Sequence, residues 1–122
     1  MAFVLVVDDD PVFREIAREI LQSGGHEVAV AEDGVKALKA IEARPPDLAV
    51  VDMLMPNRDG IETLGDLRRR WPEVKVIMVS AGARLLDADA LLGAARALGA
   101  DATLGKPLDR TRLLSLVDSL LG

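Results

Sequence analysis

The fold of this chain is decided by the stretch Leu48-Ala-Val-Val-Asp-Met-Leu-Met-Pro-Asn-Arg-Asp-Gly60, in which an apolar run ends at a single carboxylate, Asp52. Four apolar residues with two valines are typical of a strand buried on both faces, and such strands belong to parallel sheets covered by helices. In open sheets of that kind, ligands bind beyond the carboxyl ends of the strands. An aspartate at a strand end is also a common helix cap or turn former. The rest of the chain has to decide between these two roles.

Short apolar runs alternate with helical periodicity along the whole chain. Strands are predicted over residues 3–7, 26–31, 48–51, 74–79 and 102–104. A helix is predicted after each strand, and the first is opened by Asp10 as cap and Pro11 at its first position. The side chains predicted to face the core are Val12, Phe13, Ile16, Ala17, Ile20, Leu21, Val35, Leu38, Ile41, Ile61, Leu64, Leu67, Trp71, Leu91, Leu92, Ala95, Leu98, Leu113, Leu114, Val117, Leu120 and Leu121.

Five strands alternating with five helices through short loops predict an α/β fold, a flavodoxin-like (βα)5 doubly wound parallel sheet with right-handed crossovers. The expected strand order is 2-1-3-4-5, with the switch point between the first and third strands. A chain of 122 residues is long enough for one core and too short for two, so residues 1–122 are expected to form one domain.

Polar residues follow four of the five predicted strands, at the point where each strand ends. Asp8 and Asp9 follow the first strand, Asp52 the third, Ser80 the fourth and Lys106 the fifth. In the predicted order these strands are neighbours, so their polar ends share one edge of the sheet. Isolated caps placed by chance would not produce this pattern, which favours a functional role for Asp52.

The composition excludes several classes of function. With no cysteine and one histidine, His26, the chain has neither disulfides nor a histidine or cysteine metal site. A net charge of −5 argues against a nucleic-acid-binding surface, and the basic run 68–70 is expected to be the solvated last turn of a helix. No apolar run approaches the roughly 20 residues of a membrane span, and no signal peptide is expected, so the predicted location is the cytoplasm.

The clustered carboxylates predict a site for a hard divalent cation. Two unit charges about 4 Å apart repel by about 4 kcal/mol at an effective dielectric constant of 20, and a cation resolves that conflict. Oxygen ligands without histidine or cysteine select Mg²⁺ or Mn²⁺. Lys106 and the Ser80 hydroxyl can then contact the oxygens of a phosphoryl group, and an aspartate is a competent phosphoryl acceptor.

The chain resembles the receiver domain of two-component response regulators over its whole length. The resemblance rests on Leu-Val-Val-Asp-Asp-Asp-Pro at 5–11, Val-Asp-Met-Leu-Met-Pro at 51–56 with Asp59-Gly60, Ser80-Ala81 and Lys106-Pro107. Each piece alone is weak, but the combination is highly specific. It implies a signalling phosphoacceptor that catalyses its own phosphorylation and dephosphorylation, rather than a metabolic enzyme.

The resemblance also assigns roles to individual residues. It implies that Asp52 accepts a phosphoryl group from a histidine kinase, a phosphotransfer protein or a small phosphodonor. Asp9, Asp52 and the carbonyl of Leu54 would bind Mg²⁺ directly, and Asp8 would hold a metal-bound water. The peptide bond before Pro107 is expected to be cis, and Asp10 is expected to be a cap rather than a ligand.

The sequence departs from the family pattern three residues before Lys106, where receivers commonly carry Tyr or Phe and this chain has Thr103. We therefore expect Ser80 to contact the phosphoryl group while the response is carried by residues 81–98 rather than by a rotating ring. Leu54, with Gly82, flanks the expected path of an attacking water. Leu54 either shields the acyl phosphate and slows its hydrolysis or simply packs on its loop.

Leu85 and Leu86 add apolar side chains ahead of the fourth helix. They either belong to a partner surface or cover the core. In the family, the face formed by the fourth helix, the fifth strand and the fifth helix often binds a partner or a second receiver, so a homodimer through that face is one expectation.

Two alternatives of other classes compete with the receiver. Asp8-Asp9-Asp10 also spells the Asp-x-Asp of haloacid-dehalogenase-type phosphohydrolases, with Asp8 as nucleophile. That class needs a further acidic pair at a strand end, whereas Asp109 and Asp118 lie in the final helix region, and it leaves Asp52 unexplained. A non-phosphorylated scaffold would require the loss of an acidic residue or of the lysine, and none is missing.

Overall fold

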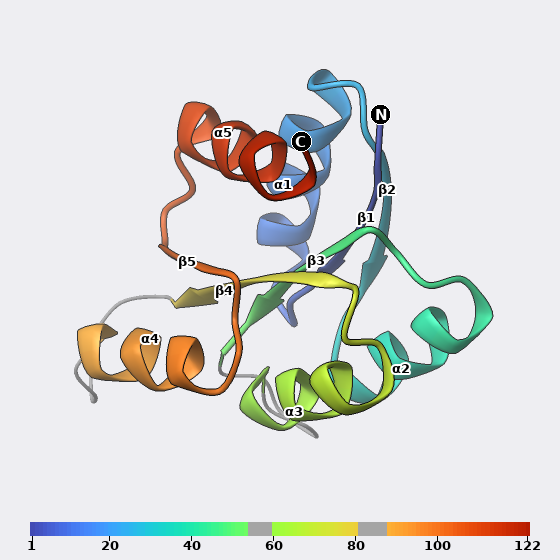
Figure 1. Ribbon diagram of the computed structural model, residues 1–122. Helices are drawn as coiled ribbons and strands as arrows, with labels where there is room; N and C mark the ends of the chain where they lie inside the picture. The colour runs from blue at the N-terminus through green and yellow to red at the C-terminus, as the bar shows by residue number, and fades with distance from the viewer. Residues whose placement is uncertain (54–59, 81–87) are drawn as a thin grey trace.

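The computed structural model describes residues 1–53, 60–80 and 88–122, with the backbone alone for 88–92 (Figure 1). Strands and helices alternate strictly along the chain. The strands are β1 (Phe3–Val7), β2 (Glu27–Ala31), β3 (Leu48–Asp52), β4 (Lys75–Ser80) and β5 (Ala102–Gly105). The helices are α1 (Pro11–Ser23), α2 (Gly34–Ala43), α3 (Gly60–Arg70), α4 (Ala88–Ala97) and α5 (Arg110–Leu121). The five strands and five helices predicted from the sequence are confirmed, with boundaries shifted by one or two residues.

All strand pairs are parallel, and the sheet has the order β2-β1-β3-β4-β5. Helices α1 and α5 cover one face of the sheet, and α2, α3 and α4 cover the other (Figure 1). The predicted doubly wound fold is therefore confirmed. Successive strands are added on one side of β1 for β2 and on the other side for β3, β4 and β5, so the switch point lies between β1 and β3, where ligands bind at the carboxyl ends of the strands.

The two faces of the central strands supply two separate cores. Leu5 and Val7 of β1 pack toward α2, α3 and α4, whereas Val4 and Val6 pack toward α1 and α5. Each of these side chains is at most 1% exposed. Burial on both faces explains why the run is wholly apolar rather than alternating.

Four side chains predicted to face the core are largely exposed, and these predictions were wrong. The exposed fractions are 64% for Val12, 48% for Ile16, 45% for Val35 and 53% for Leu98. A helix on a sheet buries the row of residues that faces the strands, and an adjacent row stays open unless another element covers it. In α1 the buried row is Phe13, Ala17 and Leu21, at intervals of four residues. The predicted positions Leu91 and Leu92 lie outside the described side chains.

Gly60 brings the start of α3 against the end of β3. A Cβ atom at this position would lie 2.1 Å from the carbonyl oxygen of Asp52 and 2.7 Å from the Cα of Met53. The Gly60 amide donates to the Met53 carbonyl at 2.9 Å. Only glycine can occupy this position so close to the β3 backbone. The contact holds the start of α3 against the backbone of Asp52 and Met53.

None of the helices that the structure describes is long and apolar enough to cross a bilayer.

Candidate functional site

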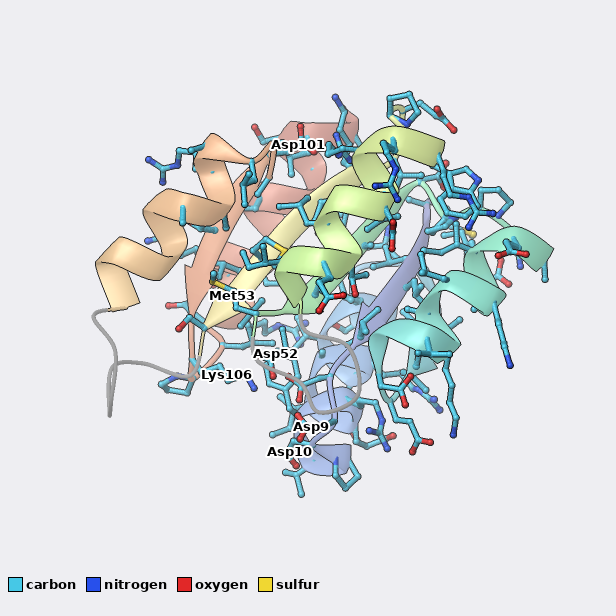
Figure 2. All side chains as sticks on the ribbon, turned by 90° about the horizontal axis from the view of Figure 1, so that it is seen from below. Asp9, Asp10, Asp52, Met53, Asp101 and Lys106 are labelled. Carbon is cyan, nitrogen blue, oxygen red and sulfur yellow. The ribbon has the colours of Figure 1, made fainter. Side chains whose placement is uncertain are left out.

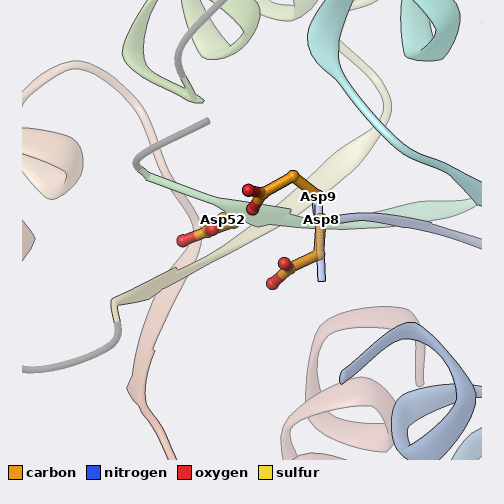
Figure 3. A group of neighbouring side chains, drawn as sticks. All are labelled: Asp8, Asp9 and Asp52. Carbon is orange, nitrogen blue, oxygen red and sulfur yellow. The ribbon is translucent and has the colours of Figure 1, made fainter. Parts of the chain in front are cut away.

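Three carboxylates meet at the carboxyl ends of β1 and β3. Val7, the last residue of β1, pairs with Val51, so Asp8 and Asp9 emerge beside Asp52. Each of the three aspartates offers an oxygen within 4.8 Å of those of the other two (Figure 3). Asp8 is fully buried and Asp52 is 5% exposed, whereas Asp9 is exposed. The predicted convergence of these residues is therefore present in the structure.

Asp8 is fixed by contacts from three elements. The amide of Asp10 donates to Asp8 Oδ1 at 2.8 Å, and the Asp8 amide donates to the carbonyl of Ala31, at the end of β2, at 3.1 Å. The Arg14 guanidinium of α1 donates to the Asp8 carbonyl at 2.8 Å. The Asp10 amide therefore orients the Asp8 carboxylate, while the other two contacts fix the Asp8 backbone.

Lys106 reaches the same carboxylates from the end of β5. Its Nζ lies 2.8 Å from Asp8 Oδ2 and 3.8 Å from Asp52 Oδ2. Figure 2 shows Lys106, Asp52 and Asp9 at one end of the sheet and Asp101 at the other. The peptide bond between Lys106 and Pro107 is cis, as the family resemblance implied.

Ser80 is tied to Lys106 through the backbone. It is the last residue of β4, is 3% exposed, and pairs with Gly105 of β5. Its carbonyl accepts a hydrogen bond from the Lys106 amide at 2.8 Å. The sheet ladder therefore fixes the Ser80 backbone beside that of Lys106, at the same edge as the acidic cluster.

Asp10 has the structural role predicted for it. Its Oδ1 accepts from the Val12 amide at 2.9 Å, which caps the N-terminus of α1. Its carboxylate is not part of the cluster formed by Asp8, Asp9 and Asp52. The predicted ligand carbonyl of Leu54 lies outside the described residues, as do Gly82, Leu85 and Leu86.

The electrostatics of the cluster suit a divalent cation. Burial raises the pKa of Asp8 above its ordinary value and Asp9 adds to that rise, while Lys106 and the Asp10 amide oppose it. Within the described residues, Asp8 Oδ2 has no hydrogen-bond partner besides the Lys106 ammonium. One lysine facing three carboxylates leaves an excess of negative charge. Oxygen donors in that charge state fit Mg²⁺ or Mn²⁺.

An apolar groove of about 460 Å³ runs beside Lys106, and the sequence did not predict it. The residues lining it are Asp10, Val12, Phe13, Ile16, Lys106, Pro107 and Leu108. Within it, the Lys106 Nζ lies 4.2 Å from the centroid of the Phe13 ring. The exposed Val12 and Ile16 of α1 therefore line a groove that also reaches Lys106 of the acidic site.

Thr103, at the position where the family usually has an aromatic ring, is linked to α4. Arg96 of α4 donates to Thr103 Oγ1 at 3.3 Å. The link connects β5 to the helix that covers it on the α2, α3 and α4 face. Sequence periodicity carries no signal for this contact, because the two residues belong to different elements.

Known proteins similar to this chain share both its sequence pattern and its fold. The family model described as "Response regulator receiver domain" matches residues 4–118. The response regulator MprA of Mycobacterium sp. (strain KMS) is 37% identical over 118 residues, which are 97% of this chain and 50% of that protein. The chain therefore spans about half the length of this curated relative.

Two solved structures have the same architecture. The receiver domain of NtrX from Brucella abortus is 32% identical with a TM-score of 0.89, covering 97% of each chain. A CheY-like receiver domain protein from Methanospirillum hungatei JF-1 is 30% identical with a TM-score of 0.89, covering 99% of this chain and 94% of the other.

Proposed function

This chain belongs to the response regulator receiver domain family of two-component systems, and from that premise we propose that Asp52 accepts a phosphoryl group from a histidine kinase, a phosphotransfer protein or a small phosphodonor. The proposal covers the catalytic roles of Asp52, Ser80 and Lys106 and the metal-binding roles of Asp8, Asp9, Asp52 and the Leu54 carbonyl. It treats residues 1–122 as one receiver domain in the cytoplasm.

One observation carries the proposal. The Lys106 ammonium lies within 4 Å of both Asp8 and Asp52, in a cluster where three carboxylates converge. A carboxylate that only capped a helix would not need a lysine from a strand two positions away. A phosphoryl group on Asp52 would bring oxygens that such an ammonium can neutralise.

The transfer can be written from the chain's own residues. An Asp52 carboxylate oxygen forms a bond to the phosphorus, and the bond between phosphorus and the donor's leaving atom breaks. Lys106 neutralises one phosphoryl oxygen and the Ser80 hydroxyl donates to another, as phosphoryl transfer generally requires. Mg²⁺, held by the acidic cluster, would supply positive charge at the transferring group. The product is an acyl phosphate, and the leaving group departs with the bonding electrons.

The groove beside Lys106 supports a docking place for the protein donor. Lys106 lines both the groove and the acidic cluster, so a helix seated on Val12 and Ile16 would carry its phosphohistidine to the edge of the site. Side chains exposed at 64% and 48% provide the apolar contact area for such a helix.

Signal output is proposed to change the face formed by α4, β5 and α5, through which a partner or a second copy would bind. The link between Arg96 and Thr103 spans two of these elements. The identity of the downstream partner belongs to the whole protein, of which relatives such as MprA have about twice the length of this chain.

The hydrolase alternative receives little support from the site. Both oxygens of Asp8 are engaged, by the Asp10 amide and by Lys106, and the residue is fully buried. Such a carboxylate is a poor nucleophile, because attack would require it to leave these contacts. The scaffold alternative would require the loss of an acidic residue or of the lysine, and Asp8, Asp9, Asp52 and Lys106 are all present.

Incubation with acetyl phosphate and Mg²⁺, followed by intact-mass measurement, tests the proposal. We expect the wild type to gain one phosphoryl group that is lost in base, and Asp52→Asn to gain none. Steady release of phosphate that persists in Asp52→Asn but not in Asp8→Asn would support the hydrolase instead. No reaction of the wild type would support the scaffold.

A further inference from the structure

We propose that Phe13 is a positioning residue for phosphoryl transfer, whose ring holds the Lys106 ammonium between Asp8 and Asp52. This inference rests on the proposed function of Asp52 as phosphoacceptor. It assigns a role to the aromatic ring of an α1 residue whose neighbours in the same buried row, Ala17 and Leu21, are aliphatic.

The ring and the ammonium are in the geometry of a cation–π interaction. The Lys106 Nζ lies 4.2 Å from the Phe13 ring centroid, within the roughly 6 Å over which such contacts are attractive. Phe13 is 7% exposed and the Lys106 side chain is 18% exposed. The interaction is stronger when both groups are largely removed from water, because water then screens the ammonium less.

Lys106 lies closer to Asp8 than to Asp52, so a third contact is needed to keep its ammonium between the two carboxylates. A lysine ammonium is a compact charge on a flexible four-carbon stem with several rotatable bonds. Its distance is 2.8 Å to Asp8 but 3.8 Å to Asp52, so charge attraction alone draws it toward Asp8. The Phe13 ring limits that movement by offering the ammonium a face on another side.

Phe13 is itself rigidly held by α1. It lies in the buried row with Ala17 and Leu21, one turn into a helix capped by Asp10. The amide of Asp10 also donates to Asp8 Oδ1. One helix start therefore places both the ring and the Asp8 carboxylate, and their spacing defines where the ammonium can sit.

The first experiment separates the π face from packing by comparing Phe13→Leu with Phe13→Tyr. Leucine keeps an apolar side chain at the site and removes the ring, whereas tyrosine keeps the ring. Acetyl phosphate is the donor, because it needs no docking surface. We expect Phe13→Leu to slow the labelling of Asp52 about fivefold, the rate change that corresponds to the loss of one cation–π contact. We expect Phe13→Tyr to restore most of the rate.

A spectroscopic signature identifies the contact directly. The Cε protons of Lys106 should be shifted upfield by the ring current in the wild type and in Phe13→Tyr, and should lose that shift in Phe13→Leu. If Phe13→Leu folds poorly, the wild-type spectrum still tests the proposal. An unshifted Lys106 signal in the wild type would by itself overturn it.

Leu21→Val is the matched control. It removes core volume from the same buried row of α1, two turns away from the ring. We expect it to lower the thermal unfolding midpoint while leaving both the labelling rate and the Lys106 signals unchanged. If Leu21→Val slows labelling as much as Phe13→Leu, the effect is one of stability and the positioning role is refuted.

The outcomes distinguish this inference from the function on which it rests. If neither the wild type nor Phe13→Leu is labelled at Asp52, the proposed function fails. If both are labelled at the same rate, Asp52 remains the phosphoacceptor and the positioning role of Phe13 is wrong.

Discussion

Lys106 forms an ion pair of 2.8 Å with Asp8, a carboxylate that has no exposed surface. The lysine comes from the end of β5 and the aspartate from the end of β1, and β3 and β4 lie between those strands in the sheet. The contact spans the carboxyl edge over Asp52. Because the same ammonium also lies 3.8 Å from Asp52, the lysine bridges two carboxylates of the acidic cluster.

Removing the lysine charge should separate phosphorylation from metal binding. We expect Lys106→Met to slow the labelling of Asp52 by about 10² or more, since one donor aimed at developing charge is worth about that factor. Mg²⁺ affinity, measured by titration calorimetry, should be unchanged or higher because the competing cation is gone. Lys39→Met, which removes an exposed lysine of α2, is the control. A parallel fall in Mg²⁺ affinity and labelling would contradict this account.

The buried Asp8 should make the metal-free protein less stable as the pH rises. Burial raises the pKa of Asp8 in the folded state, so the folded protein binds this proton more readily than the unfolded chain does. Stability is therefore lost as the pH rises from the unfolded value of about 3.9 through the raised folded pKa. Urea unfolding with a chelator, from about pH 4 to about pH 7, should show this loss in the wild type and less of it in Asp8→Asn. If the free energy of unfolding changed with pH in the same way in the wild type and in Asp8→Asn, the pKa of Asp8 would not be raised.

Metal addition should stabilise the fold through the acidic cluster. At free Mg²⁺ about 100 times its Kd, we expect a gain of about 2.7 kcal/mol in the free energy of unfolding. Asp9→Asn should lose most of that gain. Asp10→Ser should retain it, because serine can replace the helix cap and Asp10 lies outside the cluster. An equal loss in both variants would mean that Asp10 is also a ligand.

Gly60 should be intolerant of a side chain. A Cβ atom would lie 2.1 Å from the Asp52 carbonyl oxygen, so we expect Gly60→Ala to cost about 3 kcal/mol or more in unfolding free energy. Gly65→Ala, in the middle of α3 with no atom within 4 Å of the added Cβ, should instead stabilise by up to about 1 kcal/mol. Similar denaturation midpoints for the two variants would show that the approach of α3 to β3 can relax.

The link between Arg96 and Thr103 should respond to the state of Asp52. With beryllofluoride and Mg²⁺, we expect the amide signals of both residues to move, because α4 and β5 lie on the proposed output face. Thr103→Val, which keeps the shape and removes the acceptor, should reduce the movement at Arg96. Shifts confined to the acidic cluster would contradict transmission through residues 81–98, most of which lie outside the described side chains.

The sequence was sufficient to predict the sheet and the composition of its polar edge. Strands β1 and β3 are buried on both faces, so their apolar runs are continuous and end sharply at Asp8 and Asp52. The alternation of strands and helices indicated a doubly wound sheet, for which 2-1-3-4-5 was the expected order, and that order brings those ends together. Asp10 was predicted correctly as a cap because capping depends on local spacing alone.

Contacts between elements could not be predicted in the same way. Periodicity gave the apolar stripe of α1 but not its buried width, so Val12 and Ile16 were wrongly placed in the core. The ring of Phe13 beneath Lys106 depends on the path of a long side chain, which no sequence spacing specifies. The same holds for Arg96 and Thr103.

The central claim, that Asp52 is the phosphoacceptor, is tested most directly by locating the acyl phosphate. Protein treated with acetyl phosphate and Mg²⁺ is reduced with borohydride, which converts a phosphorylated aspartate to homoserine, and is then digested and sequenced by mass spectrometry. We predict homoserine in place of Asp52 alone, and none when Mg²⁺ is chelated. Homoserine in place of Asp8 or Asp9, with Asp52 unmodified, would contradict the account.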